Sequence, residues 1–344
     1  MSTSAPDRLA ARRTPQRTAV LVVAAIAGLH VLGWGTLLVA AFTGVARLSP
    51  DGAAPAATLA VGLTAYALGL RHAFDADHIA AIDNTTRSLQ ERHRPASTVG
   101  LWFSLGHSTV VFVLCTLLAA GLGVVSSALA DDGSALHQVT GVWGPSVSSV
   151  FLLVLAGIGI ATLASGRQGA GGPVWRALAR AQSAIDRPSR MYGVGLLFGL
   201  GFDTATEIGL LALAGTATLT AVPWWVVLSL PVIFAAGMSM LDTTQGALAR
   251  RAYAFAPDAP RRSAYATWMT ALSVVAALVV AVVQLAGVAE GILGDARRSA
   301  AMPVSWLAGL DIESLGLWLT ALLLGTWAVV AASVLARRRH GQGV

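Results

Sequence analysis

The chain has 344 residues, of which 55% are hydrophobic and only 12% are charged, with a formal net charge of +6. A soluble domain carries about 25% charged residues, so this composition excludes an ordinary soluble globular protein. All 23 basic residues are arginines, and the absence of lysine excludes both a P-loop ATP site and Schiff-base catalysis, which require that residue.

The apolar residues fall in long blocks, and a helix needs about 20 of them to cross the hydrocarbon core of a bilayer. Barrel strands are shorter and alternate in hydrophobicity, so we expect an all-α polytopic membrane protein. The permease domain is predicted at 18–336, between a basic N-terminus at 1–17 and a tail at 337–344. About eight transmembrane helices are predicted, at approximately 18–44, 57–82, 97–124, 141–165, 191–216, 222–246, 264–288 and 315–336.

The arginines predict the orientation, because cytoplasmic loops of membrane proteins are enriched in basic residues. With the N-terminus inside, nearly all arginines fall in cytoplasmic segments; Arg47, Arg297 and Arg298 fall outside, and Arg71 lies within a span. We therefore expect a protein of the cytoplasmic membrane with both termini in the cytoplasm. Arginines at loop edges indicate anionic lipid headgroups as partners, and we expect no nucleic-acid partner.

The end of the second block and Asp83 directly after it carry six ionisable residues in thirteen positions, and such residues are rare within a span and usually functional. On an ideal helix Arg71 and Asp75 are neighbours that can neutralise each other. His72, Asp75 and His78 project within about 120° of one another. Asp77 points elsewhere and joins them only if the helix is distorted. We favour a metal site here over a purely structural ion-pair cluster. The six residues are Arg71, His72, Asp75, Asp77, His78 and Asp83.

The third block supplies His107, which we expect to be a further metal ligand from a second helix. His72 lies about ten residues before the predicted inner loop near 83–96, and His107 lies about ten residues after it. At 1.5 Å per residue both lie about 15 Å from the inner surface, so the two imidazoles can meet. Gly106 permits close helix approach. The alternative for His107 is a hydrogen-bonded helix contact.

The fifth and sixth blocks add acids to the translocation path. Asp203 and Glu207 are four residues apart on one helix face, with no basic residue in their span. Either Arg71 neutralises them, or they line a metal or proton path; both interpretations stay open. Asp242 is deep enough to join the path, and Met238 is either a packing residue or a soft ligand. No site role is assigned to His30, His93, His137, His340 or Cys115.

A short internal repeat accompanies these motifs. Residues 68–79 resemble 198–208, and 106–108 resemble 237–239. In the predicted topology the related helices run in opposite directions, which indicates a possible inverted repeat with a site near the membrane midplane.

Imidazole and carboxylate groups without thiolates are typical of a site for a borderline transition metal. The metal would be a transported substrate, and we expect no cofactor. A divalent cation gains about 4.6 kcal/mol per 100 mV of membrane potential, twice the single-charge value. No ATPase subunit is therefore required for uptake.

Four motifs resemble those of the nickel/cobalt transporter (NiCoT) family. The segment 71–79 resembles the His-x4-Asp-His signature of its second helix, while 105–111, 200–207 and 237–244 resemble its third-, fifth- and sixth-helix motifs. The resemblance implies an eight-helix secondary permease for Ni²⁺ or Co²⁺ in which His72, Asp77 and His78 are essential. Gln245 departs from the pattern, because the family usually has an acid there.

Three functions fit these residues, and we expect metal uptake. Related families include exporters, but these often carry a His-rich loop, and no loop here has one. An intramembrane metalloenzyme would normally need a His-Glu-x-x-His motif, which the chain lacks. We therefore expect a transporter and not an enzyme.

Overall fold

The computed structural model describes residues 5–45, 55–120, 134–164, 185–201, 222–254, 259–293 and 312–340, with six isolated residues between them (180, 210, 213, 214, 307 and 309). These parts of the chain contain helices and no strand, which confirms the all-α class. The helices are α1 (Ala5–Phe42), α2 (Pro55–His72), α3 (Ala76–Glu91), α4 (Val99–Ala119), α6 (Ala135–Ala164), η1 (Pro188–Arg190), α8 (Met191–Gly199), α10 (Trp224–Val227), α11 (Ser229–Ala254), α12 (Ala259–Leu293) and α14 (Ile312–His340).

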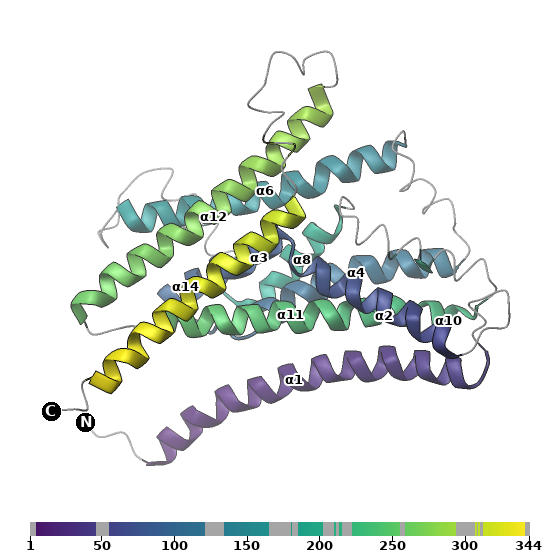
Figure 1. The fold of residues 1–344 in the computed structure, drawn as a ribbon, viewed down its shortest axis with the longest axis horizontal. Coiled ribbons are helices and arrows are strands. Elements are labelled where there is room, and N and C mark those ends of the chain that lie inside the picture. Colours follow the sequence, from purple (N-terminus) through teal and green to yellow (C-terminus); the bar gives the residue numbers. More distant parts are fainter. Residues whose placement is uncertain are drawn as a thin grey trace.

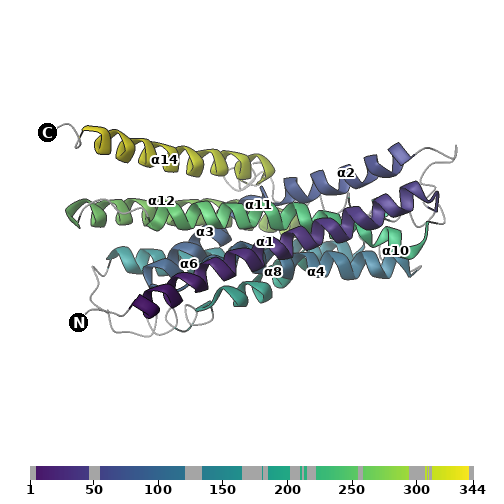
Figure 2. The ribbon, with the colours of Figure 1, turned by 90° about the horizontal axis from the view of Figure 1, so that it is seen from below.

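The long helices pack into a bundle in which α12 and α14 are tilted relative to α1 and α11 (Figure 1), and Figure 2 shows the bundle from below. Five segments of the described chain are long and apolar enough to cross a membrane: Gln16–Phe42, Val99–Ala119, Gln138–Ala164, Trp224–Tyr253 and Ala266–Ile292. The prediction of a polytopic membrane protein is therefore confirmed. The total of eight spans stays a prediction.

The single helix predicted at 57–82 is wrong, because the chain leaves the helix after His72 and starts a new one at Ala76. Asp75 has an extended backbone (φ −62°, ψ 137°) and is the N-cap of α3, a position that aspartate favours. Asp77 adds a second acid to the first turn, where the helix dipole favours negative charge. Tight backbone hydrogen bonds close the break, from Phe74 to Arg71 (2.9 Å) and from Asp75 to His72 (3.0 Å), so the peptide groups are not left unpaired in the bilayer.

The loop predicted near 83–96 is also wrong over most of its length, because α3 continues to Glu91. This helix is polar, yet every residue from His78 to Leu89 is buried. Neighbouring helices α4, α6, α11, α12 and α14 enclose it. Asp83 accepts hydrogen bonds from Tyr253 (2.8 Å) and Ser273 (2.7 Å), so its carboxylate is satisfied inside the protein instead of in water.

Glycines bring two helix pairs into backbone contact, α4 with α8 and α2 with α11. In each pair a Cβ atom added to either glycine would lie within 3 Å of a carbonyl oxygen of the opposing helix, so only glycine fits there. The contacts are Gly106 with Tyr192 and Gly195 with Phe103 in the first pair, and Gly237 with Tyr66 and Gly69 with Phe234 in the second. The same residue types, Phe-x-x-Gly on one helix and Tyr-x-x-Gly on the other, recur in both pairs. Gly106 and Gly237 correspond as in the predicted repeat, whereas Gly69 corresponds to Gly195 and not to Gly199 as predicted.

Candidate metal centre

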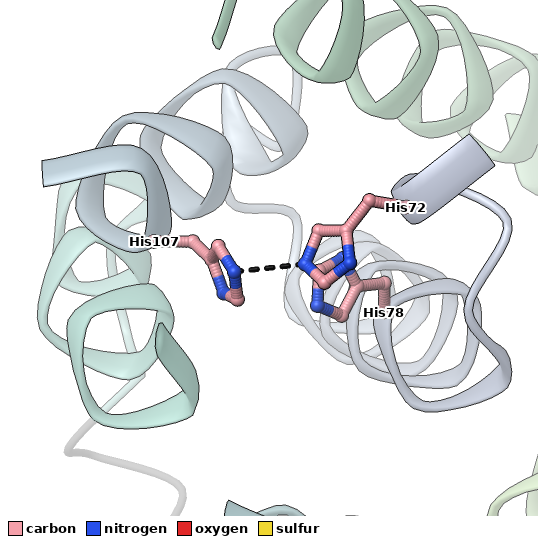
Figure 3. Close-up of side chains that lie close together, drawn as sticks. All are labelled: His72, His78 and His107. Atoms are coloured by element: carbon pink, nitrogen blue, oxygen red, sulfur yellow. Dashed lines mark hydrogen bonds between the residues drawn. The ribbon is translucent and has the colours of Figure 1, made fainter. Parts of the chain in front are cut away.

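Three histidines from three helices meet inside the bundle. His72 is the last residue of α2, His78 lies in the first turn of α3, and His107 lies in α4. Their relative exposures are only 1%, 2% and 2%. Each offers a ring nitrogen, and these three atoms all lie within 4.8 Å of one another. Figure 3 shows the rings pointing into a shared space from different helices.

The closest approach is between His72 and His107, whose Nε2 atoms are 2.8 Å apart. The ring centroid of His78 lies 4.6 Å from that of His72 and 4.9 Å from that of His107. Metal–imidazole bonds are about 2.0–2.1 Å long, so two nitrogens bound at a right angle would be about 3 Å apart. A small shift of the two rings would therefore let His72 and His107 bind one ion.

The carboxylate of Asp75 lies beside His72, with its Oδ2 3.0 Å from Nδ1 of that ring. Among the described residues, this Oδ2 makes no hydrogen bond, so the contact is one of proximity and charge. A carboxylate next to the second ring nitrogen commonly supports a metal-ligating histidine, and a neutral imidazole with its proton on Nδ1 has a lone pair on Nε2. Asp75 is thus a close neighbour of His72, whereas the sequence suggested pairing with Arg71. That suggestion depended on Arg71 and Asp75 being four residues apart on one helix, and the helix break between them removes this relation.

Aromatic rings pack against His72 and His78. Phe103 and Phe198 lie 4.8 and 6.3 Å from the ring of His78, and Phe234 lies 5.5 Å from the ring of His72. Among the described residues, Nδ1 of His78 is buried without a hydrogen-bond partner. An unsatisfied buried polar atom is costly, and a bound cation is one way to satisfy a ring of this kind.

Both carboxylate oxygens of Asp77, the residue before His78, accept hydrogen bonds. Its Oδ1 accepts a hydrogen bond from the backbone N–H of His78 (2.9 Å), and its Oδ2 accepts one from Gln284 of α12 (3.2 Å). Within the described part of the chain, the three histidines are the group whose ligand atoms lie close enough together to hold an ion, and a ligand role for Asp75 or Asp77 stays a prediction.

Asp242 and Met238 of α11 contact residues of α4 that are close to His107 in the sequence. Oδ2 of Asp242 accepts a hydrogen bond from Ser104 (2.6 Å), and Ser108 lies 3.6 Å from the sulfur of Met238. Both residues are fully buried. Within the described chain, Oδ1 of Asp242 has no hydrogen-bond partner.

Of the other predicted path residues, Arg71 alone falls in the described part of the chain. Arg71 is exposed at the end of α2. Asp203 and Glu207 lie outside the described residues. The sequence interpretation missed Gln284, together with Ser148 and Ser149. A signal was present, since Gln284 is an isolated polar residue near the end of the apolar block 264–288.

Comparison with known proteins agrees with a metal-transport site. The model of the NicO family, described as high-affinity nickel-transport protein, matches residues 58–169 and 169–333. The nickel transporter NicT of Mycobacterium tuberculosis is 44% identical over 331 residues, which cover 90% of this chain and 86% of NicT. The nickel transporter NixA of Staphylococcus aureus is 38% identical, covering 78% and 83% of the two chains. The cobalt transport protein NhlF of Rhodococcus rhodochrous is 38% identical, covering 73% and 74%. No solved structure gives a significant match.

Proposed function

The chain belongs to the NicO family of high-affinity nickel-transport proteins, and from that premise we propose that it takes up Ni²⁺ or Co²⁺ through the cluster of His72, His78 and His107. The protein is a nickel/cobalt transporter of the membrane and not an enzyme. The observation that carries the site assignment is three buried imidazoles with ligand atoms within 4.8 Å. Imidazole nitrogens suit late divalent metals such as nickel.

The path beside the cluster runs along the shared face of α4 and α11 in this proposal. Ser104 and His107 are three residues apart on α4, which places them on one face. Asp242 contacts Ser104 and has a carboxylate oxygen free to receive a cation. Asp242 and Met238 are therefore the residues that the cation contacts next along the path. Asp203, Glu207 and Arg71 are further path residues assigned from the sequence alone.

The proposal also covers the orientation of the protein in the membrane and the driving force for cation entry. We place the protein in the cytoplasmic membrane with both termini in the cytoplasm. The start of α1 and the end of α14 lie at the same end of the bundle (Figures 1 and 2), which supports placing them on one side. The arginine-rich segments contact anionic headgroups. The membrane potential drives entry of the divalent cation, so no ATPase subunit is needed.

The test is metal binding by the purified protein, combined with uptake by cells that lack their own nickel and cobalt carriers. Alanine at His78 or His107 is expected to abolish accumulation and to lower Ni²⁺ and Co²⁺ affinity at unchanged expression. His93→Asn is the matched control, because His93 is exposed outside the cluster and asparagine tolerates its positive φ of 55°. Near-normal binding and uptake by either alanine variant would refute the site assignment.

A further inference from the structure

The carboxylate of Asp77 is held by a hydrogen bond from Gln284 of α12 (3.2 Å). The bond from Gln284 joins residues 207 positions apart in the sequence, and it connects the first turn of α3 to the second half of α12. On the same carboxylate, Oδ1 accepts a hydrogen bond from the backbone N–H of His78. One side chain thus links a helix of the scaffold to the residue that carries a candidate ligand.

Gln284 is itself fixed in orientation. It is 4% exposed and lies within the span Ala266–Ile292, where polar groups are costly and usually functional. Its Oε1 accepts hydrogen bonds from the hydroxyls of Ser148 (2.8 Å) and Ser149 (3.2 Å) on α6. Because the carbonyl oxygen faces these two donors, the NH₂ group faces Asp77, which can only accept when ionised.

The start of α3 needs such an external support. The helix break after His72 separates His78 from α2 by a short turn, so covalent connection to α2 does not fix the direction of α3. Metal sites require their ligands to be held within about 0.5 Å of the productive geometry, by neighbours that are themselves hydrogen-bonded. The serine pair, Gln284 and Asp77 form a continuous buried chain of that kind.

We propose that Gln284, held by Ser148 and Ser149, is a positioning residue for the metal site, and that it acts by clamping Asp77 and thereby fixing His78. The inference rests on the proposed function of the histidine cluster. It assigns Asp77 a role through hydrogen bonds, in which the carboxylate places a ligand and does not itself bind the metal. The requirement for Asp77 that the NiCoT resemblance implies is then met without direct coordination.

The first test replaces Gln284 with leucine, which keeps a similar volume and removes the donor. Loss of such supporting partners typically costs 10–100-fold in metal affinity. We expect a weakening of this size for Ni²⁺ and Co²⁺, measured by titration calorimetry, together with a raised KM for uptake and an altered visible spectrum of the Co²⁺-loaded protein. Ser148→Ala is the milder variant and should shift the affinity in the same direction.

The control is Thr162→Val, also on α6, because the Thr162 hydroxyl bonds only to its own helix at Ile158 (2.9 Å). It removes a hydroxyl from the same helix and should leave affinity and spectrum unchanged. Wild-type affinity and an unchanged Co²⁺ spectrum in both Gln284→Leu and Ser148→Ala would overturn the proposal.

Exchanging the acid and the amide between positions 77 and 284 tests whether Asp77 positions His78 or binds the metal directly. In the double variant Asp77→Asn with Gln284→Glu, the asparagine amide can donate to the new carboxylate, which still accepts from the two serines. We expect each single variant to weaken metal binding and the double variant to recover a large part of it. If the folded double variant binds no better than Asp77→Asn alone, Asp77 acts as a ligand and the positioning role is wrong. Failure of the histidine cluster itself would appear separately, as unchanged binding in His78→Ala.

Discussion

His72 shows how one side chain can be prepared for metal binding by a neighbour only three residues away. Oδ2 of Asp75 lies 3.0 Å from Nδ1 of His72, and Nε2 of that ring faces His107. A carboxylate partner fixes the tautomer and the direction of the ring and raises its basicity. The same residue is the N-cap of α3, so Asp75 links the local backbone break to the chemistry of the site.

Asp75→Ala should therefore weaken Ni²⁺ and Co²⁺ binding by about 10–100-fold, the usual effect of removing such a carboxylate. Asp75→Asn should fall between wild type and the alanine variant, because its carbonyl oxygen can still accept from Nδ1. Titration calorimetry on purified protein measures the affinity, and circular dichroism checks that the helices are retained. Equal affinity of the alanine variant and wild type would show that His72 needs no orienting carboxylate.

At the level of the helices, length and polarity made the long apolar elements predictable. The predicted spans 222–246 and 264–288 lie within α10–α11 and α12, because an apolar block of that length has no alternative to a helix in a bilayer. The break at 73–75 was not predicted, since neither proline nor glycine marks it. Asp75 followed by Asp77 was the available signal, because it is a common start of a helix.

The polar helix α3 was mistaken for a loop for a related reason. Its residues look water-exposed in sequence, but contacts with α11 and α12 bury them, and sequence alone does not contain those contacts. The approach of His72 to His107 was expected, and their Nε2 atoms do meet. The direction of Asp77 could not be predicted, because Gln284 lies 207 residues away.

The glycine contacts between helices give a prediction with an internal control. A Cβ on Gly195 would collide with the carbonyl of Phe103 and lie 3.0 Å from the backbone nitrogen of His107, whereas a Cβ on Gly193 meets nothing within 4 Å. Gly195→Ala should push α8 away from α4, destabilise the protein by about 1–3 kcal/mol as overpacking does, and weaken metal binding through His107.

Gly193→Ala should leave both properties near wild type or raise stability slightly, because alanine is favoured over glycine in a helix by up to about 1 kcal/mol. Thermal unfolding of the detergent-solubilised protein and calorimetric titration with Co²⁺ measure the two effects. If the two alanine variants behave alike, the close packing of α4 on α8 does not position His107.

Across the whole molecule, two of the three candidate ligands lie in different glycine-packed pairs, while His78 lies on α3. His72 belongs to α2, which packs on α11, and His107 belongs to α4, which packs on α8. In each pair a helix from the first half of the chain contacts one from the second half. Inverted-repeat transporters place their substrate at such a junction between repeats. The histidine cluster therefore lies where a repeat-based transporter would need it.

The orientation of the whole molecule can be tested with single cysteines. Cys115 is the one cysteine of the chain and is fully buried, so an introduced thiol has little competition from it. Gln168 lies outside the described residues, in a segment that contains Arg167, Arg176 and Arg180. The enrichment of arginine in cytoplasmic loops places this segment inside the cell.

A cysteine at Gln168 should therefore resist a membrane-impermeant thiol reagent added to intact cells and react once the membrane is permeabilised. A cysteine at Ala53 is the matched comparison, because the segment that follows the first span is predicted on the outer side. It should react in intact cells. Labelling of position 168 but not of position 53 from outside would invert the topology and place both termini outside. Since the membrane potential drives cations inward whichever way the protein faces, such a result would change which end of the path receives the metal while leaving the histidine site in place.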